Sequence, residues 1–162
     1  MPDISVVTGK PYYSGSWSDI RDLCRVLNIG EGKIASINQQ TVNRFQEMVD
    51  REIDGMLEDM YWVPLVQINQ YQPDGTTKSI FPGALTRLAR YWTAGLMLQV
   101  QFQGVDPNTN ESAASFIEDS RKEVFKMRRM QHRLPGQRMK SGHMGHTMPP
   151  TMMPPVAPEQ DW

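Results

Sequence analysis

The 162-residue sequence has a single cysteine, Cys24, so an intramolecular disulfide framework is excluded. It has no apolar run of about 18 residues, the length needed to span a membrane as a helix, so we expect no membrane association. The first ten residues lack the basic stretch followed by an apolar stretch that marks a secretory signal. These absences favour a soluble chain of one compact domain, with Cys24 as a small buried hydrophobic residue.

The sequence also lacks a recognisable catalytic arrangement. Four acids, Glu47, Asp50, Asp54 and Glu58, recur within one helical pattern, but no histidine, nucleophile or glycine-rich phosphate loop lies near them. Their spacing, with Arg51 four residues after Glu47, is typical of a solvated helix face. We therefore expect no enzymatic activity, no cofactor and no metal held by these acids.

The most regular pattern in the chain lies in residues 40–64. Its apolar residues recur at three- and four-residue steps, which places them on one face of an α-helix. Thr41 or Asn38 can cap the first turn, and Pro64 should stop the helix because the residue before a proline avoids the α region. The apolar face consists of Val42, Phe45, Val49, Ile53, Met56, Leu57 and Met60.

Three further helices and a hairpin are expected around this central helix. A short helix over residues 19–27 is expected after an N-cap at Ser18, and a long helix should run from Pro82 to Gly104. A third long helix is expected over residues 112–134. Between residues 64 and 81, two stretches of β-favouring residues flank the turn sequence Pro73-Asp74-Gly75, which predicts a β-hairpin. A lone hairpin is marginal in water, so this one should project and contact a neighbouring subunit or a tail-side partner.

The predicted fold class is therefore mainly α. It is a small helical bundle of one short and three longer helices, with a β-hairpin insertion and extended arms at both ends. We divide the chain into an N-terminal arm (1–17), a helical domain (18–134) and a partner-binding tail (135–162). The helix that begins at Pro82 is apolar around much of its circumference, which is typical of burial on several sides. We predict that Trp92, Met97 and Phe102 lie near a contact with another subunit.

The formal net charge of -1 hides a basic region. Eight of the 17 Lys and Arg residues, but only one acid, lie between residues 121 and 140. This region lacks the interleaved aromatics of a single-strand platform and a recognisable helix-turn-helix. Phosphate binding and docking on an acidic protein surface both remain open. The cluster consists of Arg121, Lys122, Lys126, Arg128, Arg129, Arg133, Arg138 and Lys140.

From Pro135 onward proline, glycine, methionine and histidine dominate, with no helical or strand period. Such a segment cannot bury enough of its own surface to offset its ordering entropy, so it is expected to need a partner. A chain cut after Leu134 should therefore keep its fold and melting temperature. Methionines give adaptable contacts, and we favour this role over Cu(I) binding by the irregularly spaced Met and His residues. The predicted contact residues are Arg128, Arg129, Arg133, Arg138, Met139, Met144, Met148, Met152, Met153 and Trp162.

The order of elements resembles the head–tail connector (adaptor) proteins of tailed bacteriophages. The resemblance lies in the short helix SDIRDLCRVLNI, in the central helix ending IDGMLEDMYWVP, and in the later helix ALTRLARYWTAGLML. It covers roughly residues 18–104. Within the central helix, the matching positions are Ile53, Asp54, Leu57, Tyr61 and Pro64.

The resemblance implies a non-enzymatic virion protein in the neck, between capsid and tail, that is assembled in the host cytoplasm. Such proteins form a ring, usually a dodecamer, beneath the portal protein. The ring extends the channel through which double-stranded DNA passes without sequence recognition, and it offers a platform for the next neck or tail protein. A C-terminal segment commonly embraces the portal. The alternative is a DNA-binding packaging protein, such as a small terminase subunit, which is also helical and ring-forming.

Overall fold

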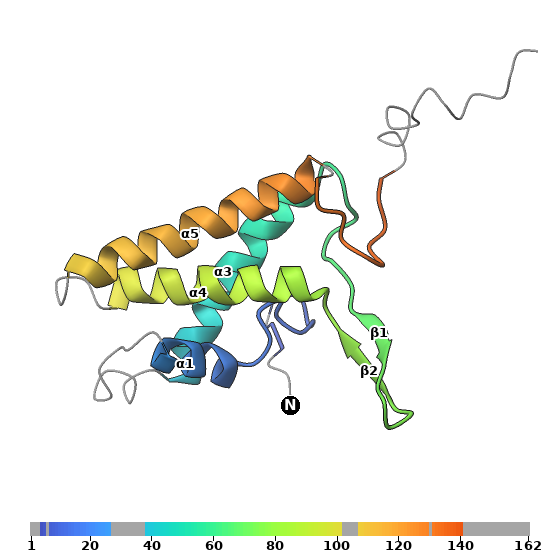
Figure 1. Ribbon diagram of the computed structural model, residues 1–162, viewed down its shortest axis with the longest axis horizontal. Coiled ribbons are helices and arrows are strands. Elements are labelled where there is room, and N and C mark those ends of the chain that lie inside the picture. The colour runs from blue at the N-terminus through green and yellow to red at the C-terminus, as the bar shows by residue number, and fades with distance from the viewer. Residues whose placement is uncertain (1–3, 6, 27–37, 102–106, 130, 141–162) are drawn as a thin grey trace, which may run out of the picture.

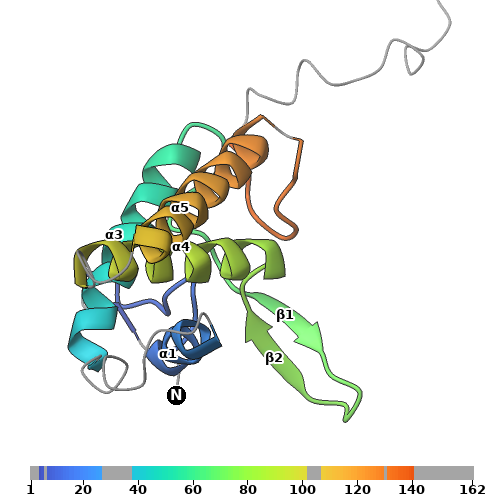
Figure 2. The same cartoon turned by 60° about the vertical axis from the view of Figure 1, so that its left-hand side comes forward.

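The computed structural model describes residues 4–5, 7–26, 38–101, 107–129 and 131–140. Within these residues lie α1 (Trp17–Val26), α3 (Gln39–Leu57), α4 (Gly83–Gln101) and α5 (Pro107–Arg128), with an antiparallel hairpin of β1 (Ile68–Tyr71) and β2 (Thr77–Ile80). Helix α4 packs against α1, α3 and α5 (Figure 1). The hairpin extends away from the helices in both ribbon views (Figure 2). The predicted mainly α bundle with a hairpin insertion is confirmed.

Helix α3 begins where the sequence predicts and ends earlier. Asn38 is its N-cap, because its Oδ1 accepts a hydrogen bond from the Thr41 amide at 2.8 Å. The helix ends at Leu57, well before Pro64, and the Met60 and Tyr61 amides both turn back to the Leu57 carbonyl. Beyond that turn the backbone groups of residues 60 and 62 pair with residues 138–140. The Trp62 amide and the Met60 carbonyl are therefore hydrogen-bonded to this segment and are not available to continue the helix.

The start of α1 differs from the prediction of an N-cap at Ser18. Ser16 Oγ accepts from the Asp19 amide at 3.3 Å, and Asp19 Oδ2 accepts from the Ser16 amide at 3.1 Å. This reciprocal pair is a capping box, so the helix begins at Trp17 and Ser18 lies inside its first turn.

Helix α5 also differs from its predicted range of 112–134. It begins at Pro107, since proline suits a first helical turn. It ends at Arg128, because the amides of Gln131 and His132 both fold back to the Lys126 carbonyl. Leu134 is buried but lies outside the helix.

Two neighbouring groups of buried side chains form the core. The larger lies where α3, α4 and α5 meet and includes the fully buried Ile53, Trp92 and Val124. The smaller lies between α1, α3, α4 and α5 and includes Ile20 and Cys24. The predicted burial of Cys24 is confirmed, and burial raises the pKa of its thiol to about 11.

Residues 134–140 lie along the body rather than away from it. The Gln137 side chain donates to the Val66 carbonyl at 2.7 Å and accepts from the Val66 amide at 2.9 Å. Met139 forms an isolated antiparallel bridge with Tyr61. The predicted boundary at Pro135 is therefore wrong for residues 135–140, which belong to the body. Residues 141–162, including Met144, Met148, Met152, Met153 and Trp162, lie outside the described residues.

Candidate interaction surfaces

The predicted subunit contact on α4 needs correction. Trp92 and Met97 are both fully buried within their own chain, so neither offers surface to another subunit. The neighbours α1, α3 and α5 cover most of the apolar circumference of α4 and leave Val100 62% exposed. Arg121 lies over the Trp92 ring, with its guanidinium carbon 5.3 Å from the ring centroid. The third predicted contact residue, Phe102, lies outside the described residues.

The hairpin is built around the predicted turn. Gly75 adopts a positive φ of 80°, which glycine accommodates without a steric penalty. Asp74 Oδ1 accepts from the Thr76 amide at 2.9 Å and from the Thr76 hydroxyl, and these hydrogen bonds lower the pKa of Asp74. Pro73, Asp74 and Gly75 are all exposed at the tip.

The strands of the hairpin are as exposed as its tip. Of their side chains only Ile68 and Ile80, a cross-strand pair at the base, are partly covered, and Tyr71 is 83% exposed. Neither outer edge pairs with another strand among the described residues. The predicted projection from the body is therefore observed, and the contacts of the hairpin stay a prediction.

An apolar patch that the sequence interpretation missed leads from α3 to the base of the hairpin. Trp62 is 58% exposed and Val66 is 49% exposed, and Lys140 Nζ lies 5.6 Å from the Trp62 ring centroid. Tyr61 and Leu65, beside them in sequence, are buried. The helical assignment up to Pro64 concealed this patch.

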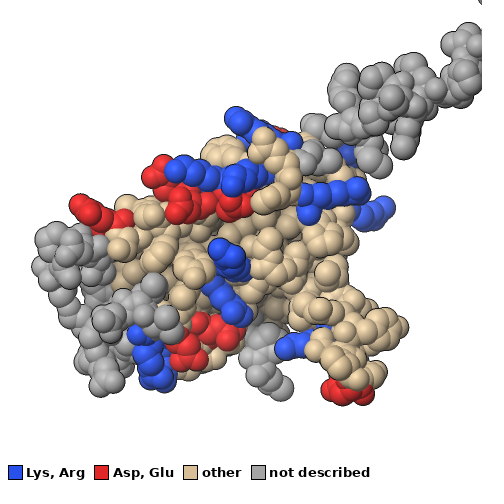
Figure 3. All heavy atoms as spheres, in the orientation of Figure 1, with Lys and Arg blue, Asp and Glu red and all other residues tan. Residues whose placement is uncertain are grey.

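Most basic residues in the first part of the predicted cluster are paired with acids. Their partners are close: Arg121 to Glu52 at 3.1 Å, Lys122 to Glu118 at 2.9 Å, and Arg128 to Asp59 at 2.6 Å. Lys126 pairs with Glu123. Exposed ion pairs of this kind contribute little to stability. Lys and Arg side chains interleave with acids over α5 and extend onto the segment that follows it (Figure 3).

The later members of the cluster differ. Arg129, Arg133 and Arg138 are exposed, and none has an ion-pair partner among the described residues. Met139, predicted to contact a partner, instead packs in part against the chain's own core. Among the described residues of the predicted partner contact, Arg129, Arg133 and Arg138 are therefore the ones that are both exposed and without an acidic partner, and the contact itself stays a prediction.

Three of the four acids predicted to lie on the solvated face, all on α3, are covered. Ser5 Oγ donates to both carboxylate oxygens of Glu47 at 2.9 and 2.7 Å, and the Tyr13 amide donates to Asp50 Oδ2 at 3.1 Å. The Tyr13 hydroxyl donates to Asp54 and accepts from the Leu65 amide at 2.8 Å. The expectation of a solvated face is wrong for these residues, because the N-terminal arm lies across them.

Two of the covered acids, Asp50 and Asp54, are harder to ionise than usual. Burial raises the pKa of Asp50, and the nearby carboxylates of Asp54 and Glu47 add to the rise. The Oδ1 atom of Asp50 is buried without a hydrogen-bond partner among the described residues. Burial also raises the pKa of Asp54. The cavity beside these acids has a volume of about 20 Å³, which is room for roughly one water. The site is therefore suited to holding the arm against α3.

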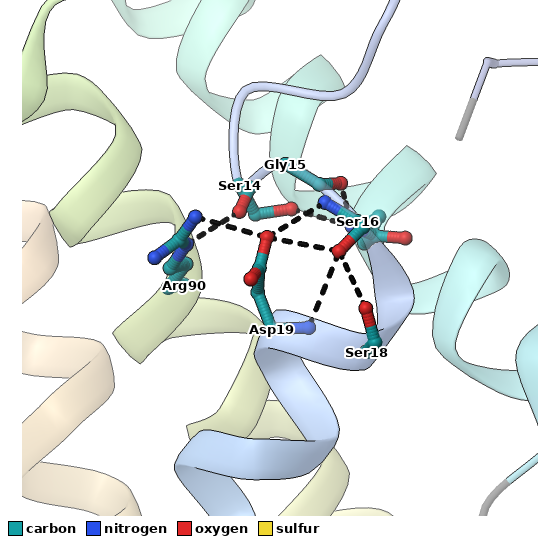
Figure 4. A network of polar contacts seen from close by, with 7 residues as sticks. Ser14, Gly15, Ser16, Ser18, Asp19 and Arg90 are labelled. Atoms are coloured by element: carbon teal, nitrogen blue, oxygen red, sulfur yellow. Dashed lines mark hydrogen bonds and ion pairs between the residues drawn. The ribbon is translucent and has the colours of Figure 1, made fainter. Parts of the chain in front are cut away.

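A second polar network fixes the arm at its junction with α1. Arg90 of α4 donates to the Ser14 carbonyl at 2.7 Å and to Asp19 Oδ2 at 3.0 Å (Figure 4). From α3, Gln46 Nε2 donates to Ser14 Oγ at 2.7 Å and to the Gly15 carbonyl at 2.9 Å. The described part of the arm is thus bound to α3 and α4 and forms part of the body.

The described part of the chain shows neither a metal-binding cluster nor a membrane-spanning helix. No group of three or more His, Cys, Asp or Glu residues there is arranged to hold a metal ion. No helix there is both long and apolar enough to cross a membrane. Comparison of the chain with protein-family models, with curated proteins and with solved structures gave no match.

Proposed function

We propose that this chain is a head–tail connector protein that forms a ring beneath a phage portal. The ring would extend the DNA channel and carry the next neck or tail protein. The observation that carries the proposal is the hairpin, which projects from the body with both edges unpaired among the described residues. The choice of a connector ring rests on the sequence resemblance. The exposed hairpin supports it by offering a surface that another chain could bind.

The physical argument rests on the exposure of the hairpin. A two-stranded hairpin is marginally stable in water unless something packs on it, and its open edges are templates for pairing with another chain. Here the body covers only the base of the strands, and Trp62 and Val66 extend the exposed apolar surface beyond that base. We assign this surface to a neighbouring copy in the ring or to the tail-side partner.

We assign the portal contact to a charged surface, in contrast to the apolar surface at the hairpin. Arg129, Arg133 and Arg138 are exposed and without acidic partners among the described residues, so they suit an acidic portal surface. Complementary charge would set orientation and association rate. The tail beyond Lys140, rich in methionine and proline, would then add adaptable apolar contact along the portal.

The test is co-assembly of the purified chain with the portal protein of the same phage, followed by electron microscopy and sedimentation. Arg133→Glu with Arg138→Glu should weaken portal binding by at least tenfold. Arg25→Glu, an exposed reversal on α1, is the matched control and should leave binding unchanged. The connector assignment is refuted if the unaltered chain neither joins portal nor forms rings.

A DNA-binding packaging protein is the second candidate, and the same free arginines favour it. Three phosphate contacts would make the logarithm of the binding constant fall with the logarithm of salt concentration at a slope of about -3. Tight, salt-dependent binding of free double-stranded DNA by the isolated chain, without portal binding, would select this candidate. Copper handling by the tail would instead appear as tight Cu(I) binding that is lost on deleting residues 139–153.

A further inference from the structure

A groove of about 1050 Å³ runs between α4 and α5; no hairpin residue lines it, and of the proposed portal contacts only Arg129 does. Its apolar lining includes Tyr91 and Phe116, whose rings meet edge to face with centroids 5.3 Å apart. Phe125 also lines the groove and is 47% exposed. An exposed aromatic lining of this kind suits an aromatic or other large apolar side chain.

The charges around the groove are predominantly positive. Four cationic side chains and two carboxylates line it, and both carboxylates are already near lysines: Asp119 is 3.9 Å from Lys122, and Glu123 pairs with Lys126. Arg87 and Arg129 line the groove without an acidic partner among the described residues. The chemistry of the groove therefore fits an aromatic side chain flanked by carboxylates.

The chain itself contains such a segment. After Glu123 the only acids in the sequence are Glu159 and Asp161, and after Phe125 the only aromatic residue is Trp162. All three lie within the stretch PEQDW at residues 158–162, which follows a long acid-free region. This stretch combines one large aromatic with two carboxylates, as the groove requires.

The segment can also reach the groove within one molecule. Residue 140 is fixed to the body through the hydrogen bond from its amide to the Met60 carbonyl. The 21 residues between it and Trp162 can span up to about 70 Å when extended, whereas a 22-residue helix such as α5 is about 33 Å long. A tether of this kind presents its end at millimolar effective concentration, so even a weak contact is populated.

We propose that residues 158–162 dock in the α4–α5 groove of their own chain. Trp162 packs against Tyr91, Phe116 and Phe125, and the carboxylates of Glu159 and Asp161 face Arg87 and Arg129. Both sides of the contact belong to this chain, so the inference does not depend on the proposed connector role. Because the proposed portal contact uses Arg129 and the same tail, portal binding would compete with this docking.

The test uses the full chain with Trp162→p-benzoylphenylalanine, which keeps an aromatic group at the end and reacts with its neighbours on irradiation. At low micromolar concentration we expect crosslinks within one chain to peptides of α4 and α5 that line the groove. Crosslinks mapping to another face, crosslinks only between copies, or no crosslink above background would each overturn the proposal.

Charge reversal gives the matched controls. Arg87→Glu with Arg129→Glu should reduce the crosslink yield at least fivefold, and so should Glu159→Arg with Asp161→Arg, which leaves the body unaltered. Combining the two pairs should restore much of the yield, whereas Arg25→Glu on α1 should not change it. A yield that is insensitive to both reversals would refute the proposed recognition even if the crosslinks map to the groove.

Discussion

Gly95 and Gly55 offer a matched test of how closely α4 and α5 pack. Both glycines lie inside long helices, but their surroundings differ. A Cβ atom added at Gly95 would lie 2.9 Å from the Ala113 carbonyl oxygen and 2.9 Å from Ile117 Cγ1, both on α5. A Cβ atom added at exposed Gly55 would meet nothing within 4 Å.

The magnitudes follow from two opposing effects. Replacing glycine by alanine inside a helix stabilises it by about 1 kcal/mol, because the backbone loses less entropy on folding. Overpacking a close helix contact costs about 1–3 kcal/mol, and a backbone carbonyl cannot yield as a flexible side chain can. Gly55→Ala should therefore raise the free energy of unfolding by up to about 1 kcal/mol. Gly95→Ala should leave it unchanged or lower it by up to about 2 kcal/mol.

Urea denaturation followed by helical circular dichroism measures both variants under one condition. The difference in free energy of unfolding between the two variants is the more informative value. The helix-propensity contribution largely cancels in it, and about 1–3 kcal/mol of packing cost remains. Equal stabilisation by both substitutions, with unchanged dependence on urea, would show that α4 and α5 do not approach closely at Gly95.

Three other outcomes are expected. Burial raises the pKa of Asp50, so stability should fall as pH rises from about 3.8 through its folded-state pKa. Asp50→Asn should flatten part of that fall in urea titrations and raise the free energy of unfolding at pH 7. Truncation after Lys140, which removes only the weak docking of the tail, should lower the melting temperature slightly. Truncation after Leu134 should lower it by several degrees, because the paired hydrogen bonds of Gln137 are also lost. A Gly-Ser linker in place of residues 71–77 should preserve helical circular dichroism and weaken assembly, and lost helicity would contradict this.

Several elements follow from local sequence alone. The three- and four-residue recurrence from Val42 to Leu57 defines the buried face of α3, since helical periodicity fixes which side chains share a face. Proline, aspartate and glycine at residues 73–75 determine the hairpin tip, because each favours a particular turn conformation. These signals depend on neighbouring residues and so can be read without knowing the rest of the fold.

Helix ends were less predictable, because a cap competes with contacts from elsewhere in the chain. Ser16 and Ser18 are both good N-cap residues, and the reciprocal hydrogen bonds with Asp19 favour Ser16. The end of α3 at Leu57 depends on pairing with residues 138–140, which are about 80 positions away in the sequence. No local signal in residues 58–64 contains that information.

The candidate surfaces were decided mainly by tertiary structure. Periodicity shows that Trp92 belongs to a broadly apolar helix, but only packing shows that α3 and α5 cover it while Phe125 is left exposed. Spacing likewise places Glu47, Asp50 and Asp54 on one face of α3. That the arm covers this face, and that Asp50 and Asp54 are costly to ionise there, follows from contacts about 40 residues apart. The sequence by itself determined the helices, the turn and the charged regions, while long-range burial alone decided which of their side chains remain available to a partner.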